Sequence, residues 1–474
     1  MHPLQRLNNR LAHFVRLHVF VKDSVPLSAS VPLARWNAAL LAFVVFASLF
    51  GQIVPAPLVT NPDLLARAMR VLSSYVTPLI FAFLVVSRFI AHPKPAKENR
   101  LVFGAALALT VSYFFSILIS ATHGEVAKSA AIAVFFSLAT VVLFDVFGSA
   151  PQTVARYLRI LCPLLVAWTV IPAVLSLAGP LRPLFMAIED SSMHGFAESR
   201  IGFVLWGSMG LFLLWCSGLR ARHQYVHDVL MGIMLIALYF AQSRGVVVGL
   251  SAAVIYYRIQ SDEPWRRKMR DIAIVVVVAA LVCLSWKVFG RQEPLEMVNG
   301  QRSSIYSSYF HELKRHSALF GAGTMVDIPL EGTTQRTQAH NLVLQWLANW
   351  GILGAIGICV FLYATWTRLK TVEARMLLLI FMTYSMTQPV QGTPNFFAPI
   401  TLLWYFTIIA VDVRSRVRAQ AVTESVPARQ ATTPAMPGRA TPSFVERPPS
   451  PVMVRSANTS RQEEEPLQTY SDSR

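Results

Sequence analysis

Apolar runs of close to 20 residues recur along most of the chain, separated by shorter polar segments. A helix of this length crosses the roughly 30 Å hydrocarbon core of a bilayer. There are about twelve such runs, at 36–54, 71–91, 101–121, 127–147, 158–178, 201–219, 226–242, 245–260, 271–289, 342–366, 375–391 and 396–412. The pattern predicts an all-α, polytopic membrane protein with about twelve transmembrane helices.

The composition excludes a soluble globular protein of this size. Hydrophobic residues make up 54% of the 474 residues and charged residues only 14%. Soluble domains usually carry about 25% charged residues. The chain is therefore expected to bury its apolar surface in lipid.

Positive charge is distributed unevenly between the two sides that alternating loops define. The side shared by both termini carries Arg6, Arg10, Arg16, Lys22, Arg35, Lys94, Lys97, Arg100, Arg156, Arg159, Arg220, Arg222, Arg258, Arg266, Arg267, Lys268, Arg270, Arg368, Lys370, Arg375, Arg414, Arg416 and Arg418. The short loops opposite carry only Arg67, Arg70, Lys128, Arg182, Arg200 and Arg244. The preference of Lys and Arg for cytoplasmic loops predicts that both termini are cytoplasmic. The net charge of +17 is thus explained by orientation, and we expect no nucleic-acid partner.

Three parts of the chain are expected. Residues 1–35 form a basic cytoplasmic arm on the membrane surface, and residues 36–414 form the transmembrane domain. One long loop, about 290–341, interrupts the spans on the outer side. Residues 415–474 are rich in Pro, Ser and Arg with few large apolar residues, which predicts a disordered cytoplasmic tail.

The long loop contains its own helical pattern. In QRSSIYSSYFHELKRHSALFGAGT, the residues Ile305, Tyr309 and Leu313 recur at helical spacing, and Phe320 follows less regularly. A short helix at the membrane interface is predicted here, ended by a turn at Gly321–Gly323.

A polar pair stands before the tenth apolar run, in the stretch AHNLVLQWLANWGILG. Either His340 or Asn341 can cap the helix that follows, whose first amides lack internal partners. Gly351 lies about 16 Å further along a straight helix. With Gly354 and Gly357 it is expected to form a stripe of small residues for close helix packing.

Arg200, Arg244 and Arg302 are all predicted on the outer side, where basic residues are scarce. A guanidinium at membrane depth is costly, so each is expected to face a polar cavity. The planar fork of arginine suits bidentate contacts with phosphate. The alternative for each is an arginine that reaches toward lipid headgroups.

Neither a metal ion nor ATP is expected. No Asp-x-Asp sequence occurs, and the first outer loop carries a single carboxylate, Asp63. No GxxxxGK[ST] phosphate-binding loop occurs either. Arginine side chains would therefore have to supply the positive charge at an anion site.

The motifs together resemble one known family. The spacing His-Asn, nine residues, Gly, two residues, Gly at 340–354 is similar to the signature of the O-antigen ligase and polymerase superfamily of bacterial envelope glycosyltransferases. The Ser-Arg-Gly segment at Arg244 and the arginine, helix and Phe-Gly-x-Gly order after Arg302 resemble two further motifs of that superfamily. The resemblance covers about residues 200–360 in motifs and excludes the tail.

The resemblance implies a GT-C-like membrane fold and a site facing the periplasm, in the inner membrane of a Gram-negative bacterium. The donor would be an O-antigen linked to undecaprenyl diphosphate, and the acceptor the lipid A-core. Arg302 and Arg244, with Arg200 and Asn341, would contact the diphosphate. His340 would take the proton of the acceptor hydroxyl, since imidazole titrates near neutral pH. No metal or cofactor is implied.

Other bases and other functions are also compatible with the sequence. The carboxylates that rival His340 as the base are Glu189, Asp190, Glu198, Glu293 and Glu312. An O-antigen polymerase or a protein O-oligosaccharyltransferase would use the same donor with another acceptor. A secondary transporter, from another functional class, is also compatible with about twelve spans and intramembrane arginine. The polar residues concentrate in the outer loops of the second half, which favours the ligase.

Overall fold

The computed structural model describes residues 97–119, 144, 147, 151–186, 193, 195, 200–288, 303–311, 314, 317–321, 328–329, 336–337, 342–387 and 403–419. Contacts divide the chain into Met1–Val422 and Thr423–Arg474, and every described residue belongs to the first of these units. The predicted arm 1–35, the first two predicted spans and nearly all of the predicted tail lie outside the described residues.

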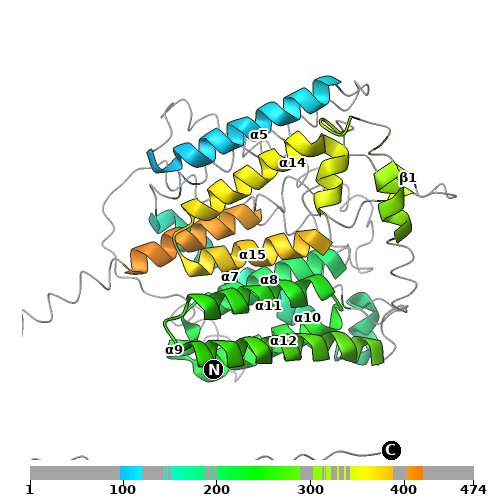
Figure 1. Ribbon diagram of the computed structural model, residues 1–474. Helices are drawn as coiled ribbons and strands as arrows, with labels where there is room; N and C mark the ends of the chain where they lie inside the picture. The colour runs from blue at the N-terminus through cyan, green and yellow to red at the C-terminus, as the bar shows by residue number, and fades with distance from the viewer. Residues whose placement is uncertain are drawn as a thin grey trace, which may run out of the picture. The chain divides into compact units, whose positions relative to one another are not determined.

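The described residues are almost entirely helical (Figure 1). The elements are η2 (Lys97–Asn99), α5 (Arg100–Ile119), α7 (Pro151–Leu175), η3 (Gly179–Leu184), α8 (Arg200–Cys216), α9 (Leu219–Arg222), α10 (Gln224–Phe240), α11 (Arg244–Gln260), α12 (Trp265–Val288), β1 (Ile328–Pro329), β2 (Arg336–Thr337), α14 (Leu342–Arg368) and α15 (Val372–Thr387). Two further helical segments cover 303–311 and 403–419. The all-α prediction is confirmed for this part of the chain apart from β1 and β2, which pair antiparallel over two residues each.

Helices occur where the apolar runs predicted them, within the described ranges. Three are long and apolar enough to cross a membrane: Val154–Leu175, Trp265–Trp286 and Trp350–Arg368. Gly202–Cys216 and Gln224–Phe240 are shorter apolar helices. The total of about twelve spans stays a prediction. The last predicted run, 396–412, overlaps a helix over 403–419. This helix continues beyond the apolar run into the polar residues that follow Asp412.

Helix α12 carries apolar side chains on surfaces that no other described element covers. Ile274, Val277, Leu281 and Leu284 are each more than half exposed. An apolar surface of this length is unfavourable in water and favourable in hydrocarbon. The helix therefore has the surface of a lipid-facing membrane span.

Glycines allow two pairs of helices to approach closely. Gly249 of α11 faces the backbone of α15, where an added Cβ would lie 3.2 Å from the Ile380 carbonyl oxygen. Gly357 of α14 faces α5, where an added Cβ would lie 3.2 Å from Leu109 Cδ1 and 3.0 Å from Ser112 Oγ. The predicted packing role of Gly357 is therefore confirmed.

Contacts of aromatic side chains show which helix ends lie together. Tyr256, near the end of α11, accepts a hydrogen bond from Arg375 Nη1 at 3.4 Å, at the start of α15. The Tyr256 ring also packs edge-on against Trp366 near the end of α14, with centroids 5.3 Å apart. Trp215, near the end of α8, packs against Tyr257 at 5.4 Å. We call this end of the bundle the basic end.

The opposite ends of the same helices therefore lie together as well. Helix α11 has 17 residues, or about 25 Å at 1.5 Å per residue. Figure 1 shows α8, α11, α14 and α15 with roughly parallel axes, and α15 runs opposite to α11 and α14 because its first turn meets their last turns. The first residues of α8 and α11, Arg200 and Arg244, and Gly351 of α14 thus lie away from the basic end. We call this the Arg244 end.

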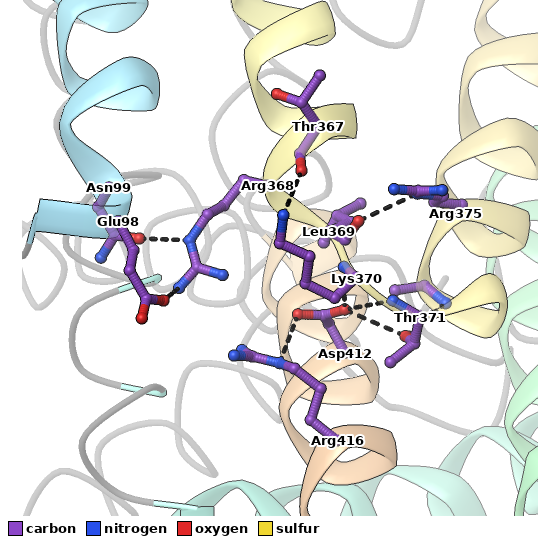
Figure 2. Close-up of polar contacts among 11 residues, drawn as sticks. Glu98, Asn99, Thr367, Arg368, Leu369, Lys370, Thr371, Arg375, Asp412 and Arg416 are labelled. Atoms are coloured by element: carbon purple, nitrogen blue, oxygen red, sulfur yellow. Dashed lines mark hydrogen bonds and ion pairs between the residues drawn. The ribbon is translucent and has the colours of Figure 1, made fainter. Parts of the chain in front are cut away.

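A fully buried carboxylate organises the basic end (Figure 2). Asp412 Oδ1 accepts hydrogen bonds from the backbone N–H groups of Lys370 and Thr371, at 2.7 and 2.9 Å, and from the Thr371 hydroxyl at 3.1 Å. Asp412 Oδ2 forms an ion pair with Arg416 Nε at 3.1 Å. Thr371 in turn accepts a hydrogen bond from the Ala374 amide in the first turn of α15. The last helix thereby fixes the turn between α14 and α15.

A buried arginine fastens the same end of α14 to α5. Arg368 Nε donates to Asn99 Oδ1 at 2.6 Å, and Arg368 Nη2 pairs with Glu98 Oε2 at 3.2 Å. The guanidinium also lies over the Phe144 ring, 5.4 Å from its centroid. Arg368 was predicted only as a charge that orients the protein, and the structure gives it a packing role in addition.

Replacing Asp412 by asparagine is expected to lower the free energy of unfolding by about 1.5–3 kcal/mol. The amide keeps an acceptor for the two backbone N–H groups and loses the charge that pairs with Arg416. Thermal unfolding of the purified protein in detergent measures the effect. Glu263→Gln is the control, because Glu263 is partly exposed in its pair with Arg258 and such pairs contribute about 0–1 kcal/mol. Equal losses in the two variants would contradict the role of Asp412.

Candidate active site

Arg244 is the first residue of α11 and follows a sharp turn from α10. Gln242, in this turn, has φ of 52° and is 4% exposed. A positive φ is uncommon for residues other than glycine. Such conformations concentrate at functional sites, where the surrounding structure holds them. The junction falls between the predicted runs 226–242 and 245–260, but the left-handed conformation of Gln242 was not predicted, because glutamine rarely adopts it.

Neighbouring side chains hold the turn against α12. Trp286 Nε1 donates to the Tyr239 carbonyl oxygen at 3.1 Å, and the Tyr239 hydroxyl lies 3.0 Å from Ser285 Oγ. The two rings are also in contact, with centroids 5.6 Å apart. The backbone that carries Arg244 is thus part of a rigid junction of three helices.

The predicted short helix of the long loop is confirmed over 303–311. Ile305 and Tyr309 are buried in a small cluster with Ala348 of α14. The Tyr309 hydroxyl donates a hydrogen bond to Gln345 Oε1 at 2.9 Å. The helix therefore lies against the first part of α14. Gln345, a polar side chain inside an apolar run, was the available sequence signal for this contact.

Helix α14 is broken at Gly351, which has φ of 63° and ψ of −167°. The break frees two amides, and both bind the loop that follows helix 303–311. Ile352 N donates to the Ala318 carbonyl at 3.0 Å, and Leu353 N donates to the Leu319 carbonyl at 3.2 Å. Figure 1 shows α14 changing direction part way along its length.

This geometry corrects the predicted role of Gly351. An added Cβ would lie 2.4 Å from the carbonyl carbon and oxygen of Leu319, so the close approach is to a loop and not to another helix. The predicted turn is present at Gly321, which has φ of 69° and donates its amide to the Ser317 carbonyl at 2.6 Å.

The structure describes only some of the predicted site residues. Arg244 is described, and Arg200 is described as the first residue of α8, in its backbone only. Arg302, His340 and Asn341 lie outside the described residues. In the chain, Arg302 directly precedes helix 303–311, and Asn341 directly precedes α14. Those two helices pack together through Tyr309 and Gln345, as described above.

Within the ranges that the structure describes, no group of three His, Cys, Asp or Glu side chains is placed to hold a metal ion. The break at Gly351 lies at the same end of the bundle as Arg244. The described residues at this end form helix junctions at Arg244 and at Gly351.

Comparison with known proteins finds a similarity to one family, over part of the chain. Residues 229–359 match the family model described as O-antigen ligase. The matched segment contains Arg244, Arg302, His340 and Asn341, and also Gly351, where α14 is broken. None of the curated proteins and none of the solved structures matches. The segment 229–359 is therefore similar to the O-antigen ligase family, in agreement with the motifs of the sequence.

Proposed function

We propose that the protein is an O-antigen ligase of the Gram-negative inner membrane. It transfers O-polysaccharide from undecaprenyl diphosphate to the outer core sugar of lipid A-core, at the periplasmic face. The observation that carries this proposal is the match of residues 229–359 to the O-antigen ligase family. That segment holds Arg244, Arg302 and His340, the three groups that the chemistry requires.

The proposed reaction is a direct displacement. The acceptor hydroxyl oxygen attacks the anomeric carbon of the donor, and the bond between that carbon and the diphosphate oxygen breaks. Undecaprenyl diphosphate leaves with the electron pair, and the hydroxyl proton passes to His340. One displacement inverts the anomeric centre, and no metal ion takes part.

The arginines serve the leaving group in this proposal. Negative charge grows on the diphosphate as the glycosidic bond breaks, and Arg302 and Arg244 stabilise that charge. Preorganised donors are most effective because they need no rearrangement during the reaction. The rigid junction around Tyr239 and Trp286 supports this role for Arg244, since it fixes the first turn of α11.

Arg302→Ala is expected to lower the transfer rate on the order of 10–150-fold. A hydrogen bond to a charged group contributes about 1.5–3 kcal/mol, and this one would act mainly in the transition state. The measurement is the turnover of lipid-linked glycan by the purified variant. Arg270→Ala is the control, because Arg270 is largely exposed and pairs with Asp271 at the start of α12. A rate for Arg302→Ala within twofold of the control would contradict the proposed role.

Separate acceptors test the proposed reaction as a whole. Purified protein is incubated with the lipid-linked glycan and, in turn, with lipid A-core, a second lipid-linked repeat unit, or a protein acceptor. The ligase proposal expects product only with lipid A-core. Elongation of the repeat unit would identify a polymerase, and a glycosylated protein would identify an oligosaccharyltransferase. Anion uptake into vesicles without any transfer would favour a transporter.

A further inference from the structure

A buried hydrogen bond joins the two helices that follow the proposed active-site residues. Tyr309 is 0% exposed and Gln345 is 2% exposed, and their side chains meet at 2.9 Å. Tyr309 comes seven residues after Arg302, and Gln345 comes five residues after His340. Each of the two proposed active-site residues is thus within seven residues of the bond along the chain.

The same two chain segments are fastened at a second place. The Ala318 and Leu319 carbonyls accept the amides of Ile352 and Leu353, just after the break in α14. One attachment would leave the segments free to pivot about it. Two attachments, at Gln345 and at 352–353, fix both their separation and their relative rotation.

We infer that Tyr309 and Gln345 are positioning residues for glycan transfer, and that they act by holding Arg302 and His340 at a set separation. This inference rests on the proposed function. Neither side chain needs to touch substrate. Reactions of two bound groups are sensitive to such placement, because a displacement of about 1 Å can cost about 100-fold in rate.

The polar nature of the pair supports this role. Two apolar side chains of the same shape would fill the same space with little change in stability. They would not, however, define how far one helix can slide along the other. A directional bond between buried groups sets that register. Ile305 and Ala348, in the same small cluster, already supply the apolar contact.

The test uses full-length purified protein and measures kcat for transfer with saturating donor and acceptor. Tyr309→Phe and Gln345→Met are each expected to lower kcat about tenfold. The double variant is expected to lose less than the product of the two single losses, since both single changes remove the bond between Tyr309 and Gln345. Tyr306→Phe is the matched control on the same helix, and it is expected to change kcat less than about twofold.

Coupling to Arg302 separates positioning from general stability. In an Arg302→Ala background, adding Tyr309→Phe is expected to change kcat less than about twofold, because the group that Tyr309 places is already absent. An equal tenfold loss in both backgrounds would overturn the positioning role. If Tyr309→Phe does not fold, Gln345→Met carries the test, in the wild-type and in the Arg302→Ala background.

The two proposals fail in different ways. Wild-type protein that transfers no glycan to any acceptor would overturn the proposed function and this role with it. Wild-type transfer that Tyr309→Phe and Gln345→Met leave unchanged would overturn the positioning role alone.

Discussion

Gly351→Ala is expected to destabilise the protein by about 2–6 kcal/mol and to abolish most of its transfer activity. A residue with a side chain at this φ and ψ costs about 1–3 kcal/mol. The added Cβ would also lie 2.4 Å from the Leu319 backbone, and such overpacking costs a further 1–3 kcal/mol or so. The break in α14 or the docked loop must move. Thermal unfolding and transfer rate, measured on the same preparation, check both parts.

Gly104→Ala in α5 is the matched control for this change. An added Cβ at Gly104 meets nothing within 4 Å, and alanine is favoured over glycine in a helix by up to about 1 kcal/mol. The control is therefore expected to be as stable as the wild type or slightly more so. If Gly351→Ala behaved like Gly104→Ala, the structural role given to the break would be wrong.

His340→Ala is expected to lower the rate of transfer on the order of 100–10,000-fold, the range of a general base. The acceptor hydroxyl would then have to lose its proton to water. Binding of the lipid-linked donor is expected to change little, because the arginines hold the diphosphate. The rate is measured with both substrates saturating, and donor binding is measured separately.

Glu312→Gln provides the comparison for His340→Ala, since Glu312 is one of the carboxylates that rival it and lies in the same loop. It is expected to retain transfer within a few-fold of the wild type. Normal transfer by folded His340→Ala together with loss in Glu312→Gln would reassign the base.

The helices were predictable because membrane spans have a strong one-dimensional signal. Their apolar length is set by the bilayer, and the predicted runs overlap α8, α10, α11 and α12 closely. The small helix at Ile305 and Tyr309 was also predictable, since its buried face repeats at helical spacing. In both cases the pattern is local in the chain.

The features that escaped prediction depend on partners distant in sequence. Gly351 has the same surroundings in the chain whether it packs on a helix or breaks one, and only the docked Leu319 backbone decides between them. Asp412 sits in an apolar run, and its burial follows from amides about forty residues earlier in the chain. The left-handed conformation of Gln242 likewise belongs to the assembled junction of α10, α11 and α12.

The most direct measurement is a structure of the protein with a lipid-diphosphate-linked glycan bound. We expect the guanidinium groups of Arg244 and Arg302 both to lie within about 3 Å of diphosphate oxygens. We also expect His340 to face the anomeric carbon from the opposite side. A diphosphate held elsewhere, or His340 remote from both arginines, would contradict the proposed mechanism.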